Sequence, residues 1–248
     1  AHLHQLRAEA AFSDDVVMKL SRVLDGVPVI KMFQTMYGKM VVTHDVEVSG
    51  VHYDSRNLGR GDLFVAIKGV AVDGHKFIDN AVAKGANVVV LEDDAALPDS
   101  YFMHAGVAKV VVQDSRKALA MMSANFFDHP SHKLNLVGVT GTNGKTSTTH
   151  LIKSILEANG ERVGLIGTIE YKIGDEVIPA THTTPESLEL NRLLATMVQR
   201  GCSAAVIEVS SHSLALSRVY GVQFAAAAFT NLTQDHLDFH RTMPEYFK

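Results

Sequence analysis

The sequence is poor in cysteine, in long apolar runs and in charge of one sign. Its 248 residues include one cysteine, Cys202, which cannot form an internal disulfide, and this usage fits a reducing cytosol. Cys202 stands beside an apolar run, and we interpret it as a small buried hydrophobic residue rather than as a nucleophile.

No uncharged apolar stretch approaches the roughly 18 residues that a membrane span needs, and the N-terminal residues lack the apolar segment of a signal peptide. The net charge is −4, with acidic and basic residues mixed along the chain. Neither nucleic acid nor a membrane surface is therefore expected as the main partner. We expect a cytoplasmic protein, and a monomer.

The chain is long enough for two domains, and its 46% hydrophobic and 20% charged residues are typical of globular proteins. Residues 1–12 carry no motif, and we place no function there. The polar, proline-containing stretch 128–133 predicts a linker. We therefore expect one domain over residues 1–133 and a second over residues 134–248.

Strands alternate with helices in the first domain, which predicts an α/β fold. From hydrophobic periodicity and turn residues we expect helices over 14–24 and 77–82, and a further helix from Ser115 with this serine as N-cap. We expect β structure over 46–51, strands over 63–67, 88–91 and 110–112, and a loop over 93–100.

The second domain is predicted to be a doubly wound, mostly parallel sheet. We expect a helix with Leu151, Ile152, Ile155 and Leu156 on its buried face, a strand over 162–166, a hairpin over 171–178, a helix from Pro185, and strands over 204–209 and 224–229.

One loop in this domain has the residues of a phosphate-binding site. The apolar run that ends at Val139 leads into Gly141, Thr142, Asn143, Gly144, Lys145, Thr146 and Ser147. Backbone N–H groups of such a loop point at phosphate oxygens, while the lysine supplies a positive charge and the threonine hydroxyl a ligand for Mg²⁺. The strict pattern for such a loop has a glycine six residues before the lysine. Val139 stands at that position, so this is a variant of the loop.

Polar residues also follow two of the predicted strands, at the edge where a doubly wound sheet binds its ligands. Glu208 ends an apolar strand, and an unpaired carboxylate there is costly, so we expect it to hold a metal with Thr146; the alternative is a carboxylate that only hydrogen-bonds a loop. His236 is a candidate second metal ligand, and the alternative for it is a loop histidine with ordinary hydrogen bonds. The adjacent Ser211 and His212 are no evidence of a nucleophilic triad.

Together these residues resemble the Mur ligase family, and within it the type that adds the third amino acid of the peptide, the UDP-N-acetylmuramoyl-tripeptide synthetases. The resemblance covers residues from about 40 to the end, and it is carried by long motifs in the right order: Gly141 to Thr146, Thr183-Thr184-Pro185, Glu208 to His212, Thr230 to His240 and, in the first domain, Asp54-Ser55-Arg56, Gly61 to Gly69 and Asp73 to Ile78.

The resemblance implies an ATP-dependent ligase of peptidoglycan synthesis. Such an enzyme phosphorylates the D-Glu carboxylate of UDP-MurNAc-L-Ala-D-Glu and transfers the acyl group to the amine of a diamino acid, meso-diaminopimelate or L-lysine. It implies that Gly144, Lys145 and Thr146 hold the phosphates of ATP, that Thr146 and Glu208 hold one Mg²⁺ and that His236 holds a second. Substrate contacts are implied for Ser55 and Arg56 at the UDP end. They are also implied for Thr183, Thr184, Ser210 and Arg218, with the muramoyl-dipeptide or its phosphates.

Several positions depart from the family pattern. Leu216 replaces a glutamine found in some members, and Val70, Ala71 and Val72 offer no polar side chain to the sugar nucleotide. The carbamylated lysine of the family is expected about two residues beyond Lys248. We therefore interpret the chain as a UDP-binding domain and a truncated ATP-binding domain, without the domain that selects the amino acid, and we expect it to be inactive alone. The alternatives are a folylpolyglutamate-type ligase and a P-loop kinase or non-catalytic nucleotide-binding module.

Overall fold

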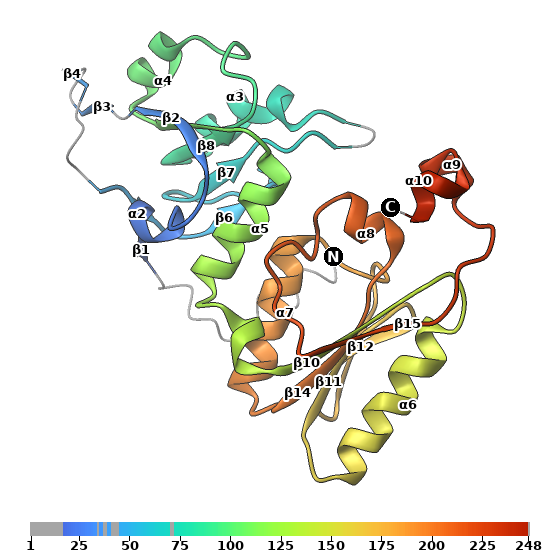
Figure 1. Ribbon diagram of the computed structural model, residues 1–248. Coiled ribbons are helices and arrows are strands. Elements are labelled where there is room, and N and C mark those ends of the chain that lie inside the picture. Colours follow the sequence, from blue (N-terminus) through green and yellow to red (C-terminus); the bar gives the residue numbers. More distant parts are fainter. Residues whose placement is uncertain (1–16, 34, 37–38, 41–44, 70–71, 248) are drawn as a thin grey trace. The chain divides into compact units, whose positions relative to one another are not determined.

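The computed structural model describes residues 17–33, 35–36, 39–40, 45–69 and 72–247. The chain forms two compact units, which divide between Phe126 and Phe127 (Figure 1). The expected α/β architecture is found in both units.

The first unit contains a five-stranded sheet in the order β2-β9-β8-β7-β6. The neighbours from β9 to β6 are parallel, and β2 joins the edge antiparallel to β9. The strand bounds are β2 Val29–Phe33, β6 Val51–His52, β7 Leu63–Val65, β8 Val88–Leu91 and β9 Ala108–Val112. Two short pairs complete the strands: β1 Met18–Lys19 with β5 Glu47–Val48, and β3 Thr35–Met36 with β4 Lys39–Met40.

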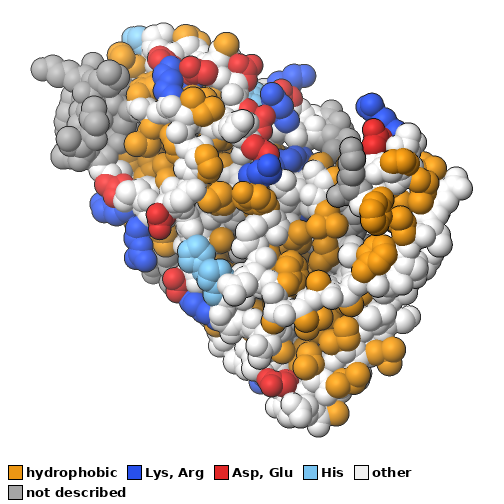
Figure 2. Space-filling model, viewed as in Figure 1, with side chains coloured by type: hydrophobic (Ala, Val, Ile, Leu, Met, Phe, Trp, Pro, Cys, Tyr) orange, Lys and Arg blue, Asp and Glu red, His pale blue; other side chains and the backbone are white. Residues whose placement is uncertain are grey.

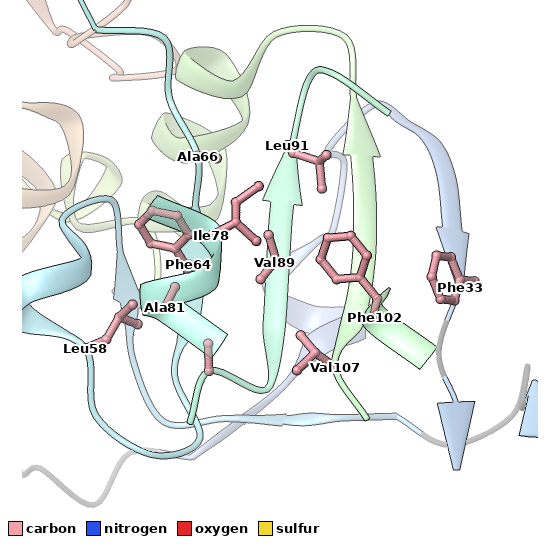
Figure 3. Close-up of a cluster of buried hydrophobic side chains, with 11 residues drawn as sticks. Phe33, Leu58, Phe64, Ala66, Ile78, Ala81, Val89, Leu91, Phe102 and Val107 are labelled. Carbon is pink, nitrogen blue, oxygen red and sulfur yellow. The ribbon is translucent and has the colours of Figure 1, made fainter. Parts of the chain in front are cut away.

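The helical segments of this unit are α2 Leu20–Val23, η1 Ser55–Asn57, η2 Gly74–Phe77, α3 Ile78–Ala83, α4 Asp99–Ala105 and α5 Ser115–Phe126. Helices α3 and α4 pack against β7 and β8 through a buried cluster that includes Phe64, Ile78, Val89 and Phe102 (Figure 3). These strands are buried on both faces, as expected for parallel strands covered by helices.

Three predictions for the first unit were wrong in detail. Residues 18–23 do not form one helix, because β1 pairs antiparallel with β5 and the Leu20 N–H donates to the Val46 carbonyl; residues 14–16 lie outside the described part. The predicted loop over 93–100 overlaps α4, whose Phe102 is fully buried. The cap of α5 is Asp114 rather than Ser115, since Asp114 Oδ1 accepts the N–H groups of Arg116 (3.1 Å) and Lys117 (3.0 Å).

The second unit contains a six-stranded sheet in the order β13-β12-β11-β14-β10-β15. The four strands from β11 to β15 are parallel, and β12 and β13 form the expected antiparallel hairpin at one edge. The strand bounds are β10 Asn135–Thr140, β11 Val163–Ile166, β12 Glu170–Ile173, β13 Glu176–Pro179, β14 Ala204–Glu208 and β15 Ala226–Phe229.

Helices cover both faces of this sheet, so the doubly wound prediction is confirmed (Figure 1). The helical segments are η3 Pro130–Lys133, α6 Lys145–Ala158, α7 Ser187–Gln199, α8 Ser211–Ala215, α9 Leu237–His240 and α10 Met243–Phe247. Ile152 and Leu156 of α6 pack on Val139, Leu165 and Val206. On the other face a Cβ at Gly164 would overlap the Met197 side chain of α7, so glycine allows this close approach.

The buried face of α6 differs from the prediction. Leu151 and Ile155 are 65% and 68% exposed, because the helix turns Thr149, Ile152, Lys153 and Leu156 toward the sheet. The outer strand β15 also exposes apolar side chains, with Phe229 60% exposed, and Figure 2 shows hydrophobic side chains over this part of the second unit.

Two properties expected from composition can be compared with the structure. Cys202 is buried, and this burial raises the pKa of its thiol, as expected for a packed cysteine. Within the described ranges, we find no helix with the length and apolar character that crossing a membrane requires.

Candidate functional site

The loop between β10 and α6 has the backbone of an anion cradle. Gly141 and Gly144 adopt φ values of +130° and +85°, and α6 begins directly after them, at Lys145. The N–H groups in the first turn of a helix have no acceptor within the helix, and they carry the positive end of its dipole. Lys145 lies across the loop, where its Nζ donates to the carbonyls of Gly141 (2.7 Å) and Thr142 (3.0 Å).

The first half of this loop is held by the segment that follows β15. The N–H groups of Thr142 and Asn143 donate to Asn231 O (2.9 Å) and Asn231 Oδ1 (3.1 Å). In return, Thr230 Oγ1 and Asn231 Nδ2 donate to the Asn143 carbonyl at 2.7 and 3.0 Å. These bonds leave the exposed Asn143 side chain, Gly144 and the start of α6 at the open end of the loop.

Glu208 is 1% exposed at the C-terminal end of β14, as the sequence predicts. Its Oε2 accepts the hydroxyls of Thr146 (3.0 Å) and Thr168 (3.1 Å), and its Oε1 accepts the Thr168 N–H (3.0 Å). The phosphate loop and the carboxylate therefore meet directly. A Cβ at Gly167 would lie 2.5 Å from Glu208 Oε1, so a larger residue there would displace the carboxylate from its present position.

These oxygens suit a hard divalent cation, since carboxylate and hydroxyl oxygens are the ligands that Mg²⁺ takes from proteins. Thr146 and Glu208 already lie within hydrogen-bond distance of each other. The part of the chain that the structure describes contains no cluster of three or more His, Cys, Asp or Glu side chains arranged for a metal. A cation here would thus depend on hydroxyl, phosphate or water oxygens as well.

The residues expected at the peptide end are connected to Glu208 by hydrogen bonds, directly or through one intermediate residue. Thr184 is 1% exposed; its hydroxyl donates to the Glu208 carbonyl (2.7 Å) and accepts the Ser210 N–H (3.1 Å). Thr183 Oγ1 lies 3.1 Å from Thr168 Oγ1. Arg218 donates through Nη1 to the Thr184 carbonyl (3.0 Å), and its Nε lies 3.5 Å from Glu186 Oε2. Thr183, Thr184, Ser210 and Arg218 thus form one network with Glu208.

His236 lies in a cluster of aromatic and imidazole rings near the C-terminal end of the described chain. Its ring is 4.8 Å from that of His212 and 6.1 Å from that of Tyr246. His240 completes the cluster, and its Nε2 lies 2.9 Å from Ser211 Oγ. Burial lowers the pKa of His212, and the electrostatic effect of the neighbouring His236 and His240 lowers it further.

The residues expected at the UDP end lie in the first unit. Ser55 is 4% exposed and its Oγ accepts a hydrogen bond from Asn80 Nδ2 (3.2 Å). The exposed Arg56 side chain pairs with Asp54, with Nη2 2.7 Å from Oδ2, and these hydrogen bonds hold the pKa of Asp54 below its ordinary value. Val70, Ala71 and Lys248 lie outside the described residues, whereas Val72 is exposed and Leu216 caps α8.

Sequence reasoning missed three contributors to this site, Gly167, Thr168 and Tyr246, and it did not predict the contact of Thr233 with the phosphate loop. Gly167 and Thr168 directly follow the strand β11, so their position at a strand end was a usable signal. Thr233 and Tyr246 act through hydrogen bonds to Thr142, a residue 91 and 104 positions away in sequence. Spacing along the chain does not reveal such contacts.

Two family descriptions match this chain. Residues 47–127 match the Mur ligase family, catalytic domain, and residues 139–248 match the Mur ligase middle domain. Two similar curated proteins are UDP-N-acetylmuramoyl-L-alanyl-D-glutamate--2,6-diaminopimelate ligases. That of Clostridium acetobutylicum is 49% identical over 93% of this chain and 45% of its own length, and that of Clostridium botulinum is 53% identical over 81% and 41%.

Solved structures agree with the fold. A UDP-N-acetylmuramoyl-L-alanyl-D-glutamate--2,6-diaminopimelate ligase superposes with a TM-score of 0.71 at 24% identity, over 93% of this chain and 43% of that one. MurF from Acinetobacter baumannii superposes with a TM-score of 0.58 at 21% identity, over 93% and 44%. The chain spans less than half the length of these curated relatives and structures.

Proposed function

The chain belongs to the Mur ligase family, and from this premise we propose that it provides the UDP-binding and ATP-binding parts of a peptidoglycan ligase. The proposed reaction joins a diamino acid to UDP-MurNAc-L-Ala-D-Glu at the expense of ATP. The observation that carries the proposal is the Thr146–Glu208 hydrogen bond (3.0 Å), which connects the phosphate loop to the network of Thr183, Thr184, Ser210 and Arg218.

The phosphate loop is proposed to bind ATP. Residues Gly141 to Ser147 supply backbone donors, and Lys145 supplies a positive charge for the phosphates. Thr146 and Glu208 would hold one Mg²⁺ and His236 a second; when bound, such ions neutralise phosphate charge. Within the chain, Thr168 donates one hydrogen bond to each oxygen of the Glu208 carboxylate, and these bonds fix its orientation beside the phosphate loop.

The network around Glu208 is proposed to hold the peptide end of the substrate. A carboxylate is a poor electrophile at neutral pH, so amide formation requires its activation, here as an acyl phosphate made with the terminal phosphoryl group of ATP. Arg218 offers guanidinium donors to an anionic group, and the backbone and side chain of Thr184 fix Arg218 and Ser210 relative to Glu208. Positioning of this kind is the main contribution a protein makes to phosphoryl transfer.

The first unit is proposed to bind the UDP end, through the buried Ser55 and the exposed Arg56. The curated relatives are named as diaminopimelate ligases, which supports meso-diaminopimelate over L-lysine as the incoming amine. We further propose a cytoplasmic, monomeric protein whose middle domain continues beyond these residues, with a further domain for selecting the amino acid. These residues alone are then expected to bind UDP-sugar weakly and not to catalyse ligation.

The proposal is tested by thermal unfolding of the chain with UDP and, separately, with Mg-ATP. We expect UDP to raise the unfolding temperature of the first unit, because a ligand that binds only the folded state stabilises it. A P-loop kinase or a nucleotide-binding module of another class should ignore UDP. Cytidine diphosphate serves as the matched control ligand. Equal stabilisation by both diphosphates, or by neither, would contradict the proposed UDP site.

A further inference from the structure

Tyr246 makes a contact with the phosphate loop that its position in the sequence does not predict. It lies in α10, its side chain is buried, and its hydroxyl is 3.0 Å from Thr142 Oγ1. The same Thr142 oxygen accepts the Thr233 N–H (2.9 Å) and donates to the Thr233 carbonyl (3.2 Å). The hydroxyl of Thr142 is therefore at the centre of three hydrogen bonds.

The direction of the Tyr246 bond follows from counting hydrogens. A threonine hydroxyl has one hydrogen and two acceptor positions. Its hydrogen is used by the Thr233 carbonyl, and one acceptor position by the Thr233 N–H. With that hydrogen on the Thr233 carbonyl, the Tyr246 hydroxyl is the donor and fills the second acceptor position; the two hydroxyls are hydrogen-bonded whichever of them donates. Thr142 is 7% exposed, so the loss of a partner there would not be replaced freely by water.

Thr142 in turn determines where the charged group of the loop lies. Lys145 Nζ donates to the Thr142 carbonyl (3.0 Å), and the Thr142 N–H donates to Asn231 O (2.9 Å). A shift of Thr142 would move both the carbonyl that holds Lys145 and the loop amides. A contact that fixes the Thr142 side chain thereby fixes the donors on which phosphate binding depends.

We propose that Tyr246 is a positioning residue for the phosphate loop: through Thr142 it holds the loop in the conformation that binds a nucleotide. The inference rests on the proposed function, since it assigns a further residue to the same ATP site. Tyr246 needs no contact with the nucleotide for this role. Because the loop is already ordered in the free protein, nucleotide binding loses less conformational entropy.

The test is a double-mutant cycle on the whole chain, with Mg-ATP as the probe and isothermal titration calorimetry as the measurement. The variants are Tyr246→Phe, Thr142→Val and the double substitution. Tyr246→Phe removes this bond alone, and we expect a loss of Mg-ATP affinity of about three- to tenfold, the effect of one net hydrogen bond. Thr142→Val also removes the two bonds to Thr233, so its loss should be at least as large. Because both variants break the same bond, the double variant should bind no more than about threefold more weakly than the weaker single variant.

Two controls separate positioning from folding. Phe247→Leu changes a neighbouring side chain of α10 that is 71% exposed, and should leave the affinity for Mg-ATP unchanged. UDP affinity, which reports on the first unit, should be the same in every variant.

Wild-type affinity in Tyr246→Phe, or strictly additive losses in the double variant, would overturn the inference. An equal loss of Mg-ATP affinity in Phe247→Leu would also overturn it, because that pattern indicates a general disturbance of α10. Failure of the unsubstituted chain to bind Mg-ATP would instead overturn the proposed function, and this inference with it.

Discussion

Gly141→Ala tests whether the phosphate loop depends on its close approach to the segment after β15. A Cβ at Gly141 would overlap the Thr230 hydroxyl and lie 2.9 Å from Asn231 O and 3.0 Å from Asn231 N. Two of these three atoms belong to the backbone, so a change of rotamer cannot relieve the crowding. Gly141 also has a φ of +130°, which residues with a Cβ rarely adopt.

The size of the effect follows from two contributions. A strained backbone conformation of this kind costs of order 1–3 kcal/mol. If the segment moves away to make room, the loop loses the hydrogen bonds that Asn231 accepts from the N–H groups of Thr142 and Asn143. Each is worth about 1 kcal/mol net. We therefore expect the second unit to lose about 3–5 kcal/mol of its free energy of unfolding.

The matched control is Gly144→Ala in the same loop. Gly144 has a φ of +85°, but no atom lies within 4 Å of an added Cβ, so only the backbone strain of about 1–2 kcal/mol is expected. The chain contains no tryptophan, so urea unfolding is followed by circular dichroism, with hydrogen exchange and mass spectrometry to assign each transition to a unit. Equal stability of the two variants would refute the close approach of the loop to residues 230–231.

Three further predictions concern the cap of a helix, acid stability and the metal. Asp114→Ala should destabilise the first unit by about 1 kcal/mol in urea unfolding, whereas Asp114→Asn should be nearly neutral because asparagine caps equally well; equal losses would argue against the cap. The hydrogen bond with Lys109 holds the pKa of the Asp99 carboxyl below its ordinary 3.8. The ionised carboxylate therefore stabilises the folded first unit above that pH, and this stabilisation is lost as the pH falls through the lower folded pKa. Asp99→Asn should therefore reduce the acid-induced drop in unfolding temperature between pH 5 and pH 2, and an unchanged profile would count against this. Glu208→Gln should abolish the effect of Mg²⁺ on ATP affinity in calorimetry, while Glu189→Gln, on α7, should leave it intact; a Mg²⁺ effect surviving in Glu208→Gln would exclude the proposed ligand.

The fold was predictable where one physical signal dominated. Strand β8 was predicted with its observed bounds, because Val88–Leu91 is an apolar run closed by turn residues. The apolar face of α7 was also predicted correctly, since Leu190, Leu194 and Met197 repeat at helical spacing. The predictions failed where tertiary pairing competes with local pattern, as at β1, where pairing with β5 overrides the helical spacing.

The phosphate loop and its neighbours also show that contacts between residues distant in sequence cannot be predicted from local pattern. Gly138, which precedes the loop and does not fit its strict pattern, has a packing role, because a Cβ there would lie 2.8 Å from the Phe224 ring. The candidate site was predictable as a set of strand ends, from the rule that ligands bind at the carboxyl edge of a parallel sheet. Its hydrogen-bond partners Thr168 and Tyr246 were not, since they are selected by three-dimensional contact.

The two units are proposed to bind different nucleotides, UDP in the first and Mg-ATP in the second. Hydrogen exchange of the whole chain, measured by mass spectrometry with each ligand alone, tests this most directly. We predict that Mg-ATP slows exchange in peptides covering residues 141–147 and that UDP slows it in peptides covering residues 54–57 and nowhere in the phosphate loop. Protection of the phosphate loop by UDP, or the absence of protection in the first unit, would contradict the account.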